Sequence, residues 1–323
     1  MEVGGIRCFD LPLNTKSELS PRLWRALPSV VSLVKKERFD LLHAHTRVTQ
    51  VLAASVSRLT GLPYISTAHG FYKGRWGRGL FPCWGRRVVA VSSVVAQDLE
   101  KTHGVSPDKI TVVHNALDIE DLERRFKSQD KKKNRSELGI PEGGFVLGCV
   151  SRLVRDKGHE YLVLAIREMV SRIPGIFLVI VGDGREKKNL EDLVKKHMLK
   201  DHVSFVPGLN DTTKVLSVID VFAHPATFRE GFGLSMAEAM IAKIPVLATT
   251  IPAIDTIFQN NVTALLVPPK DAESLAKAIQ RLAEDRALAS AIAQNGHALA
   301  LKLCQSQRQA EEMERVYESV LKP

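Results

Sequence analysis

The chain has 323 residues, 45% of them hydrophobic and 25% charged, which is the composition of a globular protein long enough for two domains. Its formal net charge of +9 is compatible with nucleic acid, anionic lipid or a phosphorylated substrate, and alone it selects none of these partners. The four cysteines are scattered with no CxxC pair, which argues against a zinc site or a disulfide framework and favours a reducing compartment.

Short apolar runs alternate with helical patterns along the chain, and this rhythm predicts parallel sheets covered by helices. We expect strands at 39–45, 63–69, 87–92, 109–115, 145–153, 176–184, 202–208, 220–226, 244–250 and 264–269. We expect helices at 21–37, 46–60, 93–103, 158–173, 186–198, 211–218, 234–242 and 271–284. No apolar run reaches the roughly 20 residues of a membrane span, and the N-terminus has no signal-peptide pattern. The expected location is therefore the cytoplasm, either free or peripheral on the inner face of the cell membrane.

The polar segment "KSQDKKKNR" at 127–135 interrupts this rhythm and predicts a solvated linker. It separates an N-terminal domain at 1–130 from a C-terminal domain at 136–305, and an amphipathic helix follows at 306–323. The expected fold class is α/β, with two doubly wound, Rossmann-like domains. The first lacks the strand, glycine-rich turn and helix that normally begin such a domain. We therefore expect an incomplete N-terminal domain with its upstream segment missing, the alternative being a naturally minimal domain.

Two cations follow the predicted strand at 145–153 and precede a helix. Ligands of open parallel sheets bind beyond the carboxyl ends of the strands, so Arg152 and Lys157 occupy a favourable place. Cations beside a helix N-terminus, whose amides and dipole favour anions, predict a diphosphate site. A pair of solvated surface cations is the alternative.

The segment "REGFGLSMAEAM" at 229–240 places Glu230 on a loop and Glu238 about one turn inside a helix. On one continuous helix the two would be roughly 12 Å apart. A glycosidase pair stands ~5–9.5 Å apart, so we expect two acids spread along one ligand. Glu238 would accept hydrogen bonds from a ribose diol and Glu230 from a second polar ring. The amides expected to meet phosphates are those of Gly231, Phe232 and Gly233. The alternative is a glutamate that only favours the helix dipole, together with a solvated loop glutamate.

These motifs resemble those of a known family. The segments "SRLVRDKG", "IVGDG", "HPATFREGFGLSMAEAM", "IPVLATT" and "ALLVPPKDAESLAKAI" follow the order seen in retaining GT-B glycosyltransferases of family 4. The segments "FDLLHAHT", "ISTAHG", "AVSS" and "VVHNALD" fit the N-terminal half of the same family. The resemblance extends from about residue 20 onward. It implies two Rossmann-like domains facing across a cleft, with a nucleotide-sugar donor held mainly by the second.

The resemblance also implies roles for individual residues. Arg152 and Lys157 would bind the donor diphosphate, Glu238 the ribose, and Glu230 the hydroxyls of the donor sugar. His69 of "STAHG" would reach the donor sugar from the N-terminal domain, a structural histidine being the alternative. The C-terminal helix would pack back on the N-terminal domain.

The implied reaction moves a hexose from a UDP-, GDP- or ADP-sugar to a glycan or lipid-linked acceptor, in the synthesis of lipopolysaccharide, capsule or another surface polysaccharide. No cofactor besides this donor substrate is expected. No metal is expected either, since the sequence contains no Asp-x-Asp. Arg152, Lys157 and helix amides would stabilise the departing diphosphate. Retaining members are thought to need no protein nucleophile, so none is assigned. A GT-B epimerase or phosphorylase and a non-catalytic nucleotide-sugar-binding remnant stay open, whereas the absence of GxGxxG disfavours a dehydrogenase.

The sequence departs from the family pattern at several glycines. Lys243 stands where the family commonly has the glycine that ends the Glu238 helix, and Asn261 replaces another glycine. A lysine in the left-handed conformation costs about 1–2 kcal/mol, so we expect local strain at this helix end.

The segment "FYKGRWGRGLFPCWGRR" at 71–87 combines aromatic and basic residues without an acid. This mixture is typical of a membrane interface or a lipid-phosphate site, so we expect binding to an anionic membrane surface. Single-stranded nucleic acid would suit the same mixture, but the surrounding motifs argue against it. A plain mobile loop is the alternative.

Overall fold

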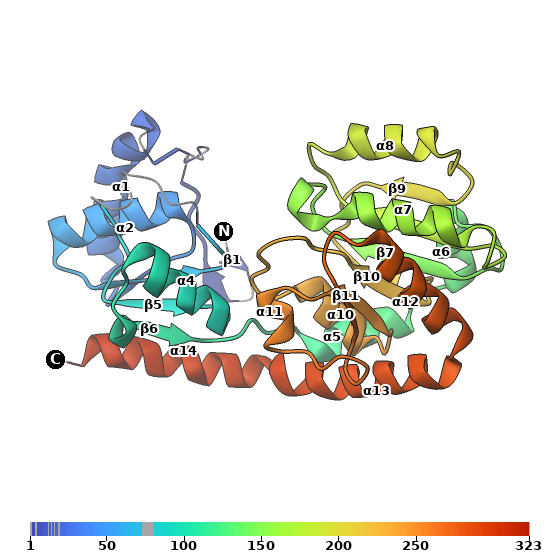
Figure 1. Cartoon of the computed structure of the whole chain (residues 1–323). Coiled ribbons are helices and arrows are strands. Elements are labelled where there is room, and N and C mark those ends of the chain that lie inside the picture. The colour runs from blue at the N-terminus through green and yellow to red at the C-terminus, as the bar shows by residue number, and fades with distance from the viewer. Residues whose placement is uncertain are drawn as a thin grey trace. The chain divides into compact units, whose positions relative to one another are not determined.

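The computed structural model describes residues 2–3, 5–11, 13, 15, 17–18, 20–72 and 81–322. The chain forms two compact units, and each is described by itself (Figure 1). The first unit comprises Met1–Val113 and Ala310–Pro323, and the second comprises His114–Gln309. This division differs from the expected boundary near residue 130. Helix α5 (Ile119–Lys127) belongs to the second unit because its Leu122 is buried in that unit's core.

The second unit contains a six-stranded, fully parallel sheet. Its strands run in the order β12 (Leu265–Val267), β11 (Val246–Thr249), β10 (Val221–His224), β7 (Val146–Val150), β8 (Phe177–Val181) and β9 (Val203–Val206). Each of them lies within a predicted strand, so this part of the prediction is confirmed. The chain winds outward from β7 to β9, returns, and winds outward again from β10 to β12. The direction of winding therefore reverses between β7 and β10, where doubly wound sheets bind ligands.

Alternate side chains of this sheet enter two separate cores, as strand geometry requires. Leu147 and Cys149 of β7 pack with α7 (His159–Met169), α8 (Lys187–Lys196) and α12 (Ala272–Glu284). Val146 and Phe222 face the opposite core. That core is covered by α5, α9 (Thr213–Leu216) and α10 (Leu234–Ile241). Both faces are thus covered by helices, which explains why the strands are near-continuous apolar runs.

The predicted linker at 127–135 is wrong, because helix α6 (Lys131–Glu137) begins within it. Asp130 caps this helix by accepting a hydrogen bond from the Lys133 amide. Asn134 is buried and donates to the hydroxyl of Ser217. These tertiary contacts hold a strongly basic segment in a helix. The sequence pattern also missed α5, α11 (Pro252–Asp255) and α13 (Arg286–Leu303).

The first unit contains a four-stranded parallel sheet, in the order β3 (Leu42–Ala44), β4 (Tyr64–Ala68), β5 (Arg87–Ala90) and β6 (Ile110–Val112). These strands and the helices α1 (Pro21–Glu37), α2 (Arg47–Thr60) and α4 (Ser93–His103) lie where they were predicted. Near the start of the chain, β2 (Ile6–Arg7) pairs antiparallel with β1 (Glu2–Val3) in a separate two-stranded sheet.

Helix α14 (Ser306–Leu321) brings the end of the chain back to the first unit, and Figure 1 shows it (red) running alongside β6. Val316 and Val320 pack against Val89 of β5. Val88 and Ala90, on the other face of β5, pack on the α4 side. The C-terminal helix therefore covers one face of this sheet. None of the described helices is both long and apolar enough to cross a membrane.

Candidate functional site

The loops that follow β7 and β10 are hydrogen-bonded to each other at the switch point of the second unit, which is where the direction of winding reverses. The amide of Thr227 donates to the carbonyl of Asp156 at 2.9 Å, which links the two loops directly. Gly158 has φ of 66°, and a Cβ at this position would lie 1.9 Å from the carbonyl oxygen of Pro225. Only glycine permits this approach. The "KG" of the predicted diphosphate motif thus has a geometric basis, because it brings Lys157 against the loop that carries Glu230.

Lys157 and Glu230 form an ion pair across these loops. Their side chains are 17% and 14% exposed, so the pair is largely screened from solvent. The same carboxylate oxygen, Oε2, lies 3.0 Å from Nε2 of His224, while Oε1 accepts a hydrogen bond from the Gly231 amide at 3.1 Å. Two of the predicted site residues are therefore in direct contact, and the sequence analysis missed the third partner, His224.

The partners of Glu230 determine its protonation. Burial acts to raise the pKa of Glu230, but the hydrogen bond from His224 and the charge of Lys157 outweigh burial and hold this pKa well below its usual range. Burial lowers the pKa of His224, against the opposing effect of Glu230. A neutral imidazole thus faces an ionised carboxylate, and the carboxylate only accepts hydrogen bonds.

A second buried histidine lies behind this network. His159, in the first turn of α7, is 2% exposed, and its Nε2 is 2.9 Å from the hydroxyl of Ser151. Burial, followed by the proximity of His224 and Lys157, lowers the pKa of His159 to about 4. The uncharged imidazole of His159 therefore holds Ser151, the first residue of the loop after β7. The only sequence signal for these two histidines was their place beside buried runs.

Arg152 and Glu238 lie apart from this ion pair. Arg152 is exposed and forms no ion pair with any described residue. Glu238 lies in α10, as predicted, and its carboxyl is hydrogen-bonded by the Thr212 hydroxyl. Burial raises the pKa of Glu238, against that hydrogen bond and the nearby charge of Arg125. Among the described residues, no hydrogen bond joins Glu238 to Glu230 or to its partners Lys157 and His224.

The glycine-containing turn before α10 is largely buried and contains an aromatic ring. Gly233 begins the helix with φ of 81°. The ring of Phe232 is only 6% exposed and packs with Ala237 and Cys304, and its centroid lies 5.6 Å from that of His114. The Phe232 side chain is thus a core residue, so only its backbone amide is available for the predicted phosphate contact.

His69 follows β4 in the first unit and is exposed. Its Nε2 lies 3.0 Å from Nδ1 of His45, and the two rings stack with centroids 5.2 Å apart. His43 completes the cluster, with its Nδ1 3.0 Å from the hydroxyl of Tyr317 on α14. Burial and then the two neighbouring histidines lower the pKa of His43 to about 4. The C-terminal helix thus supports the strand end that precedes His45.

The aromatic and basic segment at 71–87 lies partly outside the described residues, since 73–80 are not described. Trp84 is buried and Tyr72 is half-buried. Their rings lie 5.5 Å apart, and both contact the ring of His103 in the core of the first unit. Phe81, by contrast, is 60% exposed. Trp84 is therefore a core residue of the first unit, and membrane binding by this segment stays a prediction.

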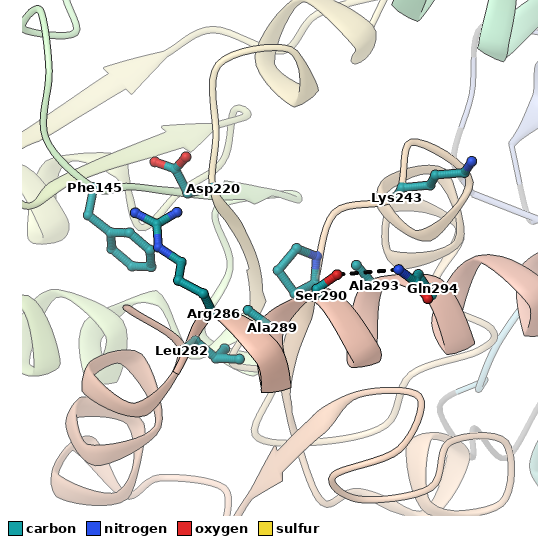
Figure 2. Close-up of a pocket in the computed structure, with 10 residues that line it drawn as sticks. Phe145, Asp220, Lys243, Leu282, Arg286, Ala289, Ser290, Ala293 and Gln294 are labelled. Carbon is teal, nitrogen blue, oxygen red and sulfur yellow. Dashed lines mark hydrogen bonds between the residues drawn. The ribbon is translucent and has the colours of Figure 1, made fainter. Parts of the chain in front are cut away.

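A pocket of about 350 Å³ lies at the amino ends of the strands of the second unit's sheet (Figure 2). Phe145, Asp220 and Pro245, which line it, immediately precede β7, β10 and β11. Arg286 and Ser290 reach it from α13. None of the predicted site residues lines this pocket. Among the described residues no group of three or more His, Cys, Asp or Glu is placed to hold a metal ion, and a metal-independent reaction stays a prediction.

The family comparison identifies the chain. The family described as Glycosyl transferases group 1 matches residues 130–298, more than half of the chain, and the family described as Glycosyltransferase Family 4 matches residues 3–121. The chain belongs to the group 1 glycosyltransferases. The two matches together span both units of this glycosyltransferase, and the recognition made from its motifs is confirmed.

Several named proteins are similar to this glycosyltransferase. The UDP-Gal:alpha-D-GlcNAc-diphosphoundecaprenol alpha-1,3-galactosyltransferase of Escherichia coli is 27% identical over 300 residues, which cover 88% of this chain and 76% of that protein. The capsular polysaccharide biosynthesis glycosyltransferase CapM of Staphylococcus aureus is 27% identical over 241 residues, covering 73% of this chain and 62% of that protein.

Solved structures share the fold. A glycosyltransferase from Rickettsia africae has a TM-score of 0.82 at 20% identity, covering 95% of this chain and 84% of that one. Anabaena HepE in complex with UDP and glucose has a TM-score of 0.82 at 23% identity, covering 94% and 82%. The α/β, GT-B fold class predicted from the sequence is thus confirmed.

Proposed function

We propose that this glycosyltransferase moves a hexose from a nucleotide-sugar donor to a glycan or lipid-linked acceptor, with retention at the anomeric carbon, in the synthesis of a surface polysaccharide. The observation that carries the proposal is the buried contact between Lys157 and Glu230 at the switch point of the second unit. A cation and a carboxylate held together there suit a ligand that has a phosphate next to a polyhydroxylated ring.

The residues of the second unit divide the donor between them. Lys157 and the exposed Arg152 bind the diphosphate, together with the amides of Phe232 and Gly233 in the turn before α10, since the Gly231 amide donates to Glu230. Glu230 accepts hydrogen bonds from hydroxyls of the donor sugar, and Glu238 accepts them from the ribose. The role of His69 towards the donor sugar stays a prediction based on its motif.

In the reaction, the bond between the anomeric carbon and the phosphate oxygen breaks. Positive charge develops on the sugar ring and negative charge on the departing diphosphate. The ammonium of Lys157 and the guanidinium of Arg152 stabilise that negative charge where it develops. The acceptor hydroxyl forms the new bond on the same face and gives its proton to the departing phosphate. This route requires no protein nucleophile.

The names of similar proteins support the donor and acceptor classes. One relative is named for a UDP-galactose donor and a diphosphoundecaprenol acceptor, and others are named for capsule and O-antigen biosynthesis. Helix α1 supports an acceptor at an anionic membrane. It exposes Arg25, Lys35 and Lys36, together with Trp24, which is 49% exposed. We therefore propose cytoplasmic activity at the inner membrane face.

The test is a panel of UDP-, GDP- and ADP-sugars. Titration calorimetry measures binding, and mass spectrometry detects transfer to a diphosphoundecaprenol-linked sugar. NMR of the product then gives the anomeric configuration. We expect one donor base to bind and the product to keep the donor's configuration. Binding without any transfer would favour a non-catalytic nucleotide-sugar-binding protein, and an inverted product would contradict retention.

A further inference from the structure

His224 is the last residue of β10, and it is buried with only 2% of its surface exposed. Its Nε2 is 3.0 Å from Oε2 of Glu230. The Thr249 hydroxyl, on the neighbouring strand β11, donates to the carbonyl of Ala226 and lies 3.5 Å from the carbonyl of His224. Both the ring and the backbone of His224 are therefore in contact with neighbouring residues, at the start of the loop that carries Glu230.

Glu230 needs a partner that stays in place during donor binding. Lys157 contacts the same oxygen, but in the proposed function this ammonium also binds the donor diphosphate. A cation shared with an anionic ligand is a poor anchor, because the ligand competes for it. The Gly231 amide is adjacent in sequence and moves with the loop. Among these three partners, His224 alone is fixed by the core of the unit.

The charges around His224 determine which nitrogen carries its proton. Glu230 and Lys157 face it from the two loops, and His159 faces it from α7. Burial and the charge of Lys157 favour a neutral ring, while Glu230 opposes them. An ionised carboxylate can only accept, so a neutral His224 must carry its proton on Nε2. Its Nδ1 is then unprotonated.

We propose that His224 is a positioning residue, whose Nε2–H holds the carboxylate of Glu230 in one orientation while Lys157 binds the donor diphosphate. The proposal rests on the function proposed above, in which Glu230 binds the donor sugar. It adds that the contact of Glu230 with the sugar depends on a group that never touches the donor.

Substitution of His224 tests this role. His224→Gln keeps an amide donor near the position of Nε2, whereas His224→Leu removes the donor and keeps an apolar side chain. His202→Leu is the matched control. His202 is half-buried and immediately precedes β9, so it lies at the opposite end of the strands from His224. Its Nδ1 is hydrogen-bonded to the Ile176 carbonyl. Thermal unfolding of each variant verifies that it is folded.

The probes are UDP with UDP-glucose, GDP with GDP-mannose and ADP with ADP-glucose, measured by calorimetry and by release of the nucleotide. For the pair that binds, we expect His224→Leu to lower both the affinity for the nucleotide sugar and kcat by roughly 10- to 100-fold. The affinity of this variant for the nucleotide alone should stay within about threefold of the wild type. His224→Gln should restore most of the loss. Equal effects of the two variants, or equal weakening of nucleotide and nucleotide sugar, would overturn the proposal.

A second measurement is independent of any donor. Long-range ¹H–¹⁵N NMR spectra of the whole protein at pH 7.5 report the tautomer of each histidine, and the signals of His224 are those lost in His224→Gln. We expect the Nε2–H tautomer. An Nδ1–H tautomer or an imidazolium would contradict the proposal. If no nucleotide binds while the Nε2–H tautomer is found, the proposed function fails and the histidine contact stands.

Discussion

At the scale of single residues, the site is organised around the carboxylate of Glu230, whose partners are Lys157, His224 and the Gly231 amide. Burial alone would make this group a weaker acid, and its partners reverse that tendency. The energetic reason is that a buried charge is tolerated when it is paired and hydrogen-bonded. Glu230 is therefore held as an acceptor suited to hydroxyl groups.

Removal of the Lys157 ammonium should impair the reaction more than binding. We expect Lys157→Ala to lower turnover about 10²- to 10³-fold, as the loss of one group that stabilises developing charge does elsewhere. The measurement is kcat with the donor found in the panel. Lys188→Ala, an exposed position of α8, serves as the control. Turnover within about threefold of the wild type in Lys157→Ala would count against this role.

At the scale of elements, the end of α10 explains how the chain tolerates a missing glycine. Lys243 has φ of 56°, so the expected left-handed conformation is confirmed, and Asn261 likewise has φ of 62°. The Lys243 amide donates to the carbonyl of Met240 and the Ile244 amide to that of Ala239, which is the hydrogen-bond pattern of a Schellman motif. The motif ends the helix in spite of the lysine.

A glycine at this helix end should stabilise the protein. Lys243→Gly relieves about 1–2 kcal/mol of backbone strain, partly offset by the greater freedom of glycine in the unfolded chain. We expect the melting temperature to rise by roughly 2–4 °C. Lys195→Gly, at an exposed position within α8, should lower it, because there the backbone is helical. Differential scanning calorimetry compares the two, and a lower melting temperature for Lys243→Gly would refute the strain.

At the scale of the whole molecule, each unit contains a parallel sheet whose strand ends carry the predicted polar residues. The exposed basic residues and Trp24 of α1 give the first unit a surface suited to anionic lipid. We expect weak binding to vesicles of phosphatidylglycerol and phosphatidylcholine that 0.5 M salt abolishes, since salt screens exposed charges. Vesicle sedimentation at low salt is the measurement.

The control compares two charge reversals of equal size. Lys35→Glu with Lys36→Glu, on α1, should remove most of the binding. Lys195→Glu with Lys196→Glu, on α8 of the second unit, should have a smaller effect. Absence of binding at low salt, or equal losses from both pairs, would exclude α1 as the membrane surface.

Stability should fall in mild acid. Burial lowers the pKa of both His159 and His43 to about 4, from 6.5 in the unfolded chain. Below pH 6.5 the unfolded chain therefore binds protons first, and the free energy of unfolding decreases until about pH 4. For the buried His159 the loss is roughly 3 kcal/mol. Glu238, with its raised pKa, acts in the opposite direction at the acidic end of this range.

Urea unfolding between pH 8 and pH 4.5 measures this dependence. His159→Gln should be less acid-sensitive than the wild type, because it removes one of the groups that gain a proton on unfolding. The difference in the free energy of unfolding between the two proteins at pH 8 gives the part of the effect of the substitution that does not depend on protonation. An unchanged slope with pH in His159→Gln would show that His159 does not contribute.

The strands and the loop and helix positions of Glu230 and Glu238 could be derived from the sequence alone. The left-handed Lys243 and the packing of α14 on the first unit were expected from the family resemblance, and both are confirmed. The strand and glutamate positions depend on short-range patterns, namely apolar runs and glycine spacing. The helix α6 and the allocation of residues 114–130 to the second unit could not be derived from the sequence. Each of these is decided by contacts between segments distant along the chain.

The same distinction holds within the site. Sequence motifs identified Lys157 and Glu230 as site residues, because residue type and spacing carry that information. Only the tertiary structure decided that these two form an ion pair and that His224 holds the carboxylate. The physical reason is that the energy of a charged side chain depends on its burial and on the partners that the fold brings to it, and a local pattern of residues contains neither.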